Sequence, residues 1–368
     1  MQLARIITTT TLACALSGPL ALAQGFDSGS DGSFGPIDIT VNTTLTTPPD
    51  GIFHATTITV GANVTLRFTK NALNTPIYLL ATGDITVDAG GFIDVSAVGR
   101  IAGPGGFDGG QLPNGDGEGP GGGLADPVSQ SGSGSYGTQS LTISPLNGNT
   151  YGNPLLIPLV GGSGGGTGGG GGGGAILLAS STRTIINGNI RALGGPWGGG
   201  RTFNAGSGGA IRIVSPTVEG TGTLNVNAFV NANSRGGVGR TRVDVIDACS
   251  LQLIMNLSVS TTGKFMVVFP TSLPKLDIID VAGQPIPLGS QDSVAVMLPF
   301  GASTAQTIVV QAEDFAGLVP IDVVVTAEGG ARTVFPAEID MAAGNPAQVS
   351  VPIDLPLNVV VRIHVWTR

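Results

Sequence analysis

Three aspartates lie close together in the first half of the sequence. They are Asp84, Asp88 and Asp94. Two carboxyl groups that flank a glycosidic bond can act as acid and base, and several carboxylates together can hold Ca²⁺, so these three are the catalytic candidates if the chain is an enzyme. Asp94, however, aligns with Arg191 and Asn225 in later repeats, and no acidic column builds up. We therefore favour a structural role, in a surface charge ladder that also contains Arg67.

Two acidic segments have the composition of calcium-binding loops. The first is a twelve-residue stretch with Asp27, Asp31 and Asp38 at positions 1, 5 and 12 and a glycine at position 6. It lacks an acid at position 3 and has aspartate where glutamate is usual. The second segment contains Asp108, Asp116 and Glu118 in glycine-rich surroundings. We therefore expect no cofactor and interpret each segment as a solvated turn, with a Ca²⁺ site as the alternative.

Four aromatic residues in glycine-rich stretches would be available to stack on a sugar ring. They are Tyr136, Tyr151, Trp197 and Phe203. Trp197, in the stretch GGPWGGGRTF, is the residue that we expect to contribute most to ligand binding. The alternative is that its side chain covers one end of the hydrophobic core.

Other chemistries find little support. His54 and His364 lie in different predicted domains, so a zinc site or a Ser-His-Asp triad would need them to meet across a boundary. The run GGGTGGGGGGGAI contains G-x-G-x-x-G, but it has no strand–turn–helix context and no Lys-Ser/Thr for a phosphate loop. Threonines crowd the N-terminal quarter, yet only Thr59 and Thr86 clearly repeat, so we interpret them as ordinary strand residues rather than a surface-binding array.

Strands must position these residues, because apolar residues alternate with polar ones and recur at a fixed offset. Ile58 and Ile85 are 27 residues apart, as are Leu66 and Ile93. Later stretches predict two columns of stacked residues, namely Leu80, Leu178 and Ile213, and Ile93, Ile190 and Leu224. Such units bury their apolar side only by stacking on one another. The sequence therefore predicts an all-β fold in which residues 24–248 form a parallel, right-handed β-helix or β-solenoid.

Glycine-rich segments interrupt this repeat over residues 99–174 and 194–209. Each returns directly into a predicted strand. One interpretation is a bent lid over one face. A second is that extended glycine runs, at 161–174, 121–123 and 198–200, pack side by side like polyproline II strands, because only glycine permits that spacing. The third is a disordered loop.

Residues 249–368 differ from what precedes them. Glycine becomes less frequent, and short β-rich runs such as KLDIIDV, QTIVVQA and IDVVVTA recur between Pro, Gly and Asn residues. About nine such strands predict an immunoglobulin-like antiparallel β-sandwich.

Composition and the N-terminus indicate export. Residues 1–23 have a basic residue, an apolar stretch and an A-x-A site, which together predict a secretory signal peptide. The chain has 61 glycines, only 11% charged residues and a formal net charge of −8. Nucleic acid and acidic membranes are poor partners for such a surface. No later segment has the roughly 18 uninterrupted apolar residues of a membrane span. We expect a secreted protein of the periplasm, cell envelope or medium.

Several stretches are similar to a family of exported, glycine-rich bacterial proteins with no established function. Among them are FTKNALNTPIYLLATGDITV, GSGGAIRIVSPTVEGTGTL and the closing VVVRIHVWTR. The resemblance covers nearly the whole mature chain. It implies secretion and a β-solenoid and supplies no catalytic residues. More distantly, the predicted solenoid resembles the pectate-lyase-type β-helix superfamily, which contains polysaccharide lyases, glycosidases and adhesins.

Together these features predict an exported, non-catalytic structural or adhesive protein of the cell surface or extracellular matrix. Its expected partner is an extracellular polysaccharide or surface component, bound by glycine-lined loops. The alternative is a polysaccharide lyase or glycosidase, which requires at least two carboxylates and an arginine to converge in a groove.

Overall fold

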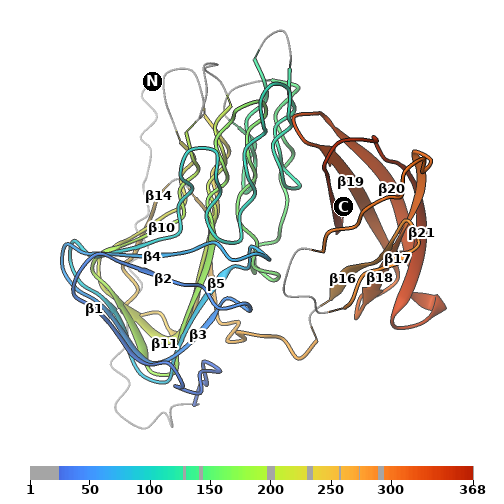
Figure 1. Ribbon diagram of the computed structural model, residues 1–368. Helices are drawn as coiled ribbons and strands as arrows, with labels where there is room; N and C mark the ends of the chain where they lie inside the picture. Colours follow the sequence, from blue (N-terminus) through green and yellow to red (C-terminus); the bar gives the residue numbers. More distant parts are fainter. Residues whose placement is uncertain are drawn as a thin grey trace, which may run out of the picture.

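The computed structural model describes residues 25–126, 130–140, 144–196, 204–229, 235–256, 258–272, 274–288 and 294–367. Within these ranges the regular structure is almost entirely β, and the one helix is the short 3₁₀ turn η1 (Met341–Ala343). Two parallel sheets are followed along the chain by two antiparallel sheets (Figure 1). The described residues include no helix with the length and hydrophobicity that a membrane crossing requires. The expected leader, residues 1–23, lies outside them and stays a prediction.

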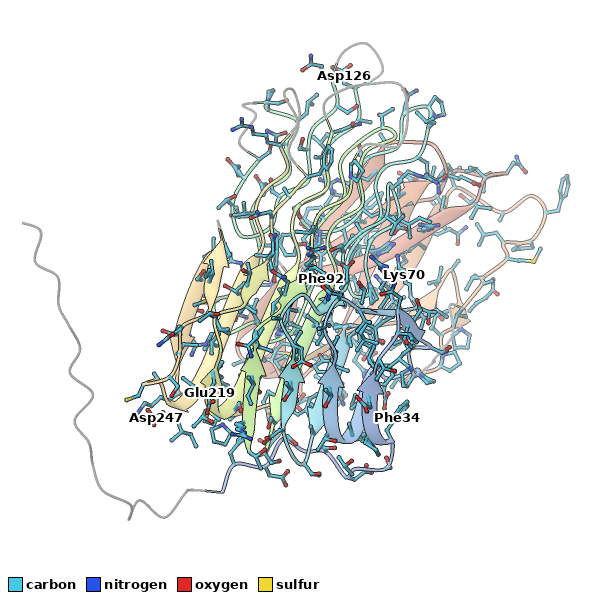
Figure 2. All side chains as sticks on the ribbon, turned by 90° about the vertical axis from the view of Figure 1, so that its left-hand side faces the viewer. Phe34, Lys70, Phe92, Asp126, Glu219 and Asp247 are labelled. Carbon is cyan, nitrogen blue, oxygen red and sulfur yellow. The ribbon has the colours of Figure 1, made fainter. Side chains whose placement is uncertain are left out.

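The larger parallel sheet has nine strands. They are β1 (Gly35–Ile39), β3 (Ile52–Val60), β5 (Ile77–Ala81), β6 (Ile85–Val87), β8 (Ala175–Ser180), β9 (Arg183–Ile186), β11 (Ala210–Glu219), β13 (Arg240–Asp247) and β15 (Val259–Gly263). Figure 2 shows these strands side by side, from the region of Phe34 to that of Asp247.

The smaller parallel sheet has six strands. They are β2 (Thr43–Leu45), β4 (Thr65–Phe68), β7 (Phe92–Asp94), β10 (Asn189–Arg191), β12 (Thr223–Asn225) and β14 (Ile254–Asn256). Both parallel sheets continue past residue 249, where we expected the first domain to end, and their last strand ends at Gly263.

The register confirms the predicted 27-residue offset. Ile58 pairs with Ile85, and Leu66 pairs with Ile93. The second predicted column is also confirmed, because Ile93 pairs with Ile190 and Ile190 pairs with Leu224. These side chains lie in one core between the two parallel sheets.

The first predicted column is wrong by one residue. Leu79, and not Leu80, pairs with Leu178, while Leu80 pairs with Ala179. Because side chains alternate between the two faces of a strand, this shift places Leu80 on the opposite face. Both faces of β5 are buried there, so the apolar run IYLLA offered no polar residue to mark the register.

A second hydrophobic core covers the outer face of the nine-stranded sheet. Strand residues Leu80, Leu177 and Val214 lie in it. Tyr136 and Leu156 from the glycine-rich stretch cover them, as does Val268 from the segment after β15. At β5, β8 and β11 this sheet is therefore buried on both faces, as is typical of parallel sheets.

The structure corrects the expected fold class. In place of a regular right-handed β-helix followed by an immunoglobulin-like sandwich, the described residues form four separate sheets. The nine-stranded sheet branches at β3, which pairs with β1, β5 and β6, and it rejoins at β11, which pairs with both β8 and β9. Six parallel strands, β3, β5, β8, β11, β9 and β6, thus form a closed barrel, and the outer face of the sheet carries the second core. Alternation along single strands predicted one buried face. It did not reveal the branching or the second covering layer.

The glycine-rich segments form a third part of the parallel region, which we call the glycine layer. It comprises residues 99–126, 130–140, 144–174, 194–196, 204–209 and 235–239. Its segments run side by side (Figure 1), with Asp126 at the far end (Figure 2). Backbone hydrogen bonds join them, for example from Gly162 N to Gly173 O and from Gly172 N to Phe107 O.

Glycine is required in this layer by close approach of backbones. A Cβ atom at Gly172 would lie 1.9 Å from the carbonyl oxygen of Gly162, and one at Gly206 would lie 1.9 Å from that of Gly171. Neither glycine has a φ in the left-handed region, so conformational freedom is not the reason. Gly123 N donates to Gly164 O, which confirms that the runs at 121–123 and 161–174 pack together. Residues 198–200 lie outside the described residues.

Two antiparallel sheets follow. One contains β16 (Lys275–Val281), β17 (Gln284–Pro285), β18 (Ala305–Glu313) and β21 (Ala347–Asp354), and the other contains β19 (Leu318–Ala327), β20 (Arg332–Asp340) and β22 (Val361–Thr367). Val310 from the first sheet and Val323 from the second belong to one shared core.

Candidate functional site

The three catalytic candidates are held by separate partners. Asp94 on β7 accepts a hydrogen bond from Arg67 at 2.9 Å, as the 27-residue offset predicted, and Arg191 is its register neighbour on β10. Asp84 accepts from Arg183 at 2.7 Å on the nine-stranded sheet. Partial burial raises the pKa of Asp84, but hydrogen bonds from Thr182 and Arg183 outweigh that effect and hold it below its usual value.

This arrangement does not bring the carboxylates together with an unpaired arginine. Asp84 precedes β6 and Asp94 belongs to β7, so they lie on different sheets, and Asp88 lies in the turn between these strands. The arginine that contacts each of the two aspartates forms an ion pair with it, Arg67 with Asp94 and Arg183 with Asp84. The contacts therefore favour a charge ladder.

The first calcium candidate is a series of local turns. Asp27 accepts a hydrogen bond from Gly29 N, and Asp31 accepts one from Ser33 N. Hydrogen bonding to Ser33 lowers the pKa of Asp31, and His54 lies 3.8 Å from its carboxylate. Asp38, the third member, lies on β1.

The second calcium candidate is dispersed over three partners. Asp108 binds Lys70 at 2.8 Å, Asp116 accepts from the backbone N of Arg332 at 2.9 Å, and Glu118 binds Arg362. Among the described residues no three His, Cys, Asp or Glu side chains are grouped as metal ligands.

Two of the four aromatic candidates, Tyr136 and Tyr151, pack against each other. Tyr136 lies in the second core, and Tyr151 packs against that core partly buried, with the two ring centroids 4.7 Å apart. The Tyr151 hydroxyl donates to Gly161 O at 2.6 Å. Burial raises the pKa of both phenols above the usual value. Burial of Tyr136, which is 1% exposed, contradicts its predicted role in sugar stacking, whereas Tyr151 is only partly buried and its role stays a prediction. Trp197 and Phe203 lie outside the described residues.

A cavity that the sequence did not reveal lies at the edge of the glycine layer. Its volume is about 330 Å³, and it is lined by Arg100, Gln111, Leu112 and Gly168. Arg100 occupies the tip of a tight turn in which Val98 and Ile101 exchange backbone hydrogen bonds of 2.9 and 3.1 Å, with Gly99 in the left-handed region. Arg100 is exposed at this turn.

The surroundings of this cavity combine one cation with exposed aliphatic side chains. Val98 is 76% exposed, Ile101 59% and Leu112 61%. Arg100 forms no ion pair with any residue that the structure describes. The site is therefore suited to an anionic ligand that also has an apolar surface.

Backbone bonds of the glycine layer fix the cavity walls. Gly109 N donates to Arg100 O at 2.9 Å, and Gly168 N donates to Gly110 O at 2.7 Å. A Cβ at Gly195 would lie 2.2 Å from Gly99 O, so residues 194–196 pack against the same turn. The only signal of this site in the sequence was the stretch VGRI, in which Arg100 follows Gly99 and lies between the aliphatic residues Val98 and Ile101.

Comparison of the chain with protein-family models, curated proteins and solved structures finds no match.

Proposed function

We propose that the protein is an exported, non-catalytic structural or adhesive component of the cell surface or extracellular matrix. In this proposal the cavity at Arg100 binds an acidic polysaccharide. The observation that carries it is the combination of an unpaired cation and exposed aliphatic side chains on a backbone layer held by lateral hydrogen bonds.

The physical basis is preorganisation. A ligand that binds to a mobile loop must order it first, and that ordering reduces affinity. Here the hydrogen bonds of Arg100 and Gly168 to neighbouring glycine segments fix the backbone around the cavity before any ligand arrives. Arg100 would pair with a carboxylate or sulfate group, while Leu112 and its neighbours would contact the apolar face of the sugar ring.

The test is to incubate the purified protein with acidic and neutral polysaccharides, with and without Ca²⁺, and to score retention and released oligosaccharides in the same samples. We expect retention of acidic polymers without products. Arg100→Ala should weaken retention at least about tenfold, equivalent to about 1.4 kcal/mol. The matched control is Arg67→Ala, since Arg67 is also an exposed arginine but is paired with Asp94.

Two results would contradict the proposal. Equal retention by Arg100→Ala and the parent protein would remove the cavity from the binding surface. Released products that disappear in Asp94→Asn would instead favour the lyase or glycosidase alternative.

A further inference from the structure

Three charged side chains are buried together on the outer face of the nine-stranded sheet. They are Arg212 on β11 and Arg242 and Asp244 on β13. Arg212 pairs in register with Arg242, and the side chains of Arg212 and Asp244 are fully buried. Two buried guanidinium groups therefore share one carboxylate, and no second carboxylate among the described residues forms an ion pair with them.

The hydrogen bonds of this cluster are incomplete. Asp244 accepts from Arg212 Nη2 at 3.1 Å, from Arg242 Nη2 at 2.6 Å and from Phe265 N at 2.9 Å. Arg212 Nε and Nη1 are buried and have no hydrogen-bond partner among the described residues. Uncompensated buried charges and unpaired donors both destabilise a fold strongly, so a missing acceptor is the simplest physical explanation.

Residues 264–269 cover the cluster, and we call them the covering segment. Arg212 Nη2 donates to Phe265 O at 3.2 Å and to Val267 O at 2.8 Å. The Phe269 ring lies 5.2 Å from that of Tyr78, yet both phenylalanines of the segment remain more than one third exposed. The segment follows β15 and is not itself part of a strand, so that its displacement would break no sheet pairing.

We propose that Arg212 and Arg242 form an anion-binding site beneath the covering segment, for one small oxyanion of the carboxylate or sulfate type. An oxygen acceptor at Arg212 Nε and Nη1 would supply a second negative charge and the missing hydrogen bonds. The site is separate from the cavity at Arg100, because its arginines belong to the strands of the sheet and not to the glycine layer. It does not depend on the function proposed above.

The test is calorimetric titration of the full chain with sodium acetate and with sodium sulfate at constant ionic strength. We expect saturable binding of about one anion per chain, weakened at least about tenfold in Arg212→Met. Arg183→Met is the matched control, because Arg183 lies on the same sheet but is exposed and paired with Asp84. A short uronate oligosaccharide, titrated in parallel, distinguishes a free anion from a carboxylate carried by a polymer.

The proposal would be overturned if the parent protein bound neither acetate nor sulfate saturably. It would also be overturned if Arg212→Met bound these anions as tightly as the parent protein does. If Arg212→Met does not fold, crystals of the parent protein soaked in selenate provide an independent test. An anomalous peak within hydrogen-bond distance of Arg212 supports the site, and its absence there rejects it.

Discussion

At the scale of the residue, the glycine layer requires residues that have no Cβ atom, because its backbones approach one another too closely to admit one. Gly172 illustrates this, because the atoms nearest to an added Cβ are the backbone oxygen and carbon of Gly162, at 1.9 and 2.1 Å. A flexible side chain could move aside, but backbone that is hydrogen-bonded to further segments cannot. Interiors packed this closely respond to a single added methyl group.

Gly172→Ala should therefore lower the free energy of unfolding by about 1–3 kcal/mol or more, as overpacking does. Gly25→Ala is the matched control, because a Cβ there meets no atom within 4 Å and Gly25 has no left-handed φ. Urea unfolding of both variants measures the difference. An unchanged unfolding midpoint in Gly172→Ala would contradict the close approach described here.

The charge ladder leads to a second residue-scale prediction. Asp94 is largely buried, but its partner Arg67 is more than half exposed, and ion pairs with an exposed partner contribute about 0.2–1 kcal/mol. Asp94 Oδ1 also accepts from Ser96 N at 3.0 Å, and asparagine retains an oxygen that can accept this hydrogen bond. Asp94→Asn should thus lower the free energy of unfolding by less than about 1 kcal/mol and leave polysaccharide retention unchanged. A loss of several kcal/mol in urea unfolding would show that Asp94 has a role beyond the pair with Arg67.

At the scale of the element, β5 is a strand with two buried faces. Leu79 belongs to the core between the parallel sheets, and Leu80 to the core on the outer face. In a strand with one solvated face, only one of the two leucines would matter for stability. Here the covering residues from the glycine layer make the second face equally apolar.

Leu79→Ala and Leu80→Ala should each lower the free energy of unfolding by about 2–5 kcal/mol, the range for a buried leucine that leaves a cavity. Val41→Ala is the control, since Val41 is two-thirds exposed and should change stability by less than about 0.5 kcal/mol. Thermal and urea unfolding of the three variants measure these changes in the free energy of unfolding. A near-neutral Leu80→Ala would mean that the outer face of β5 is solvated.

The same elements show how much the sequence predicts. The 27-residue offset predicted the pairing of Leu66 with Ile93 and the ion pair of Arg67 with Asp94, because stacked parallel strands keep a fixed register. It failed at Leu80, where a run of apolar residues has no alternation to read. The cavity at Arg100 was missed because it depends on contacts between segments distant in sequence.

At the scale of the whole molecule, the glycine layer and the antiparallel sheets meet through charged groups. Arg332 on β20 donates its backbone N to Asp116, and Arg362 on β22 binds Glu118. His364 and Trp366 of β22 line a small cavity at the same contact. Two of the acidic calcium candidates, Asp116 and Glu118, thus contact the antiparallel sheets, and calcium binding stays a prediction.

This contact should make stability depend on pH through His364. Burial lowers the pKa of His364 below 6.5, an effect that Glu118 opposes and Arg362 reinforces. The folded chain therefore holds this histidine neutral while the unfolded chain takes up a proton. As the pH falls below about 6.5 the unfolded state binds more protons, so the free energy of unfolding must decrease.

Urea unfolding of the parent protein and His364→Gln at pH 8 and at pH 5.5 measures this effect. Glutamine does not titrate, so the parent protein should lose more stability on acidification than the variant does. His54→Gln, at the partly exposed histidine near Asp31, controls for the other imidazole. If the parent protein and His364→Gln lose the same unfolding free energy between pH 8 and pH 5.5, protonation of His364 does not destabilise the contact between the glycine layer and β22. The acid sensitivity must then arise elsewhere in the molecule.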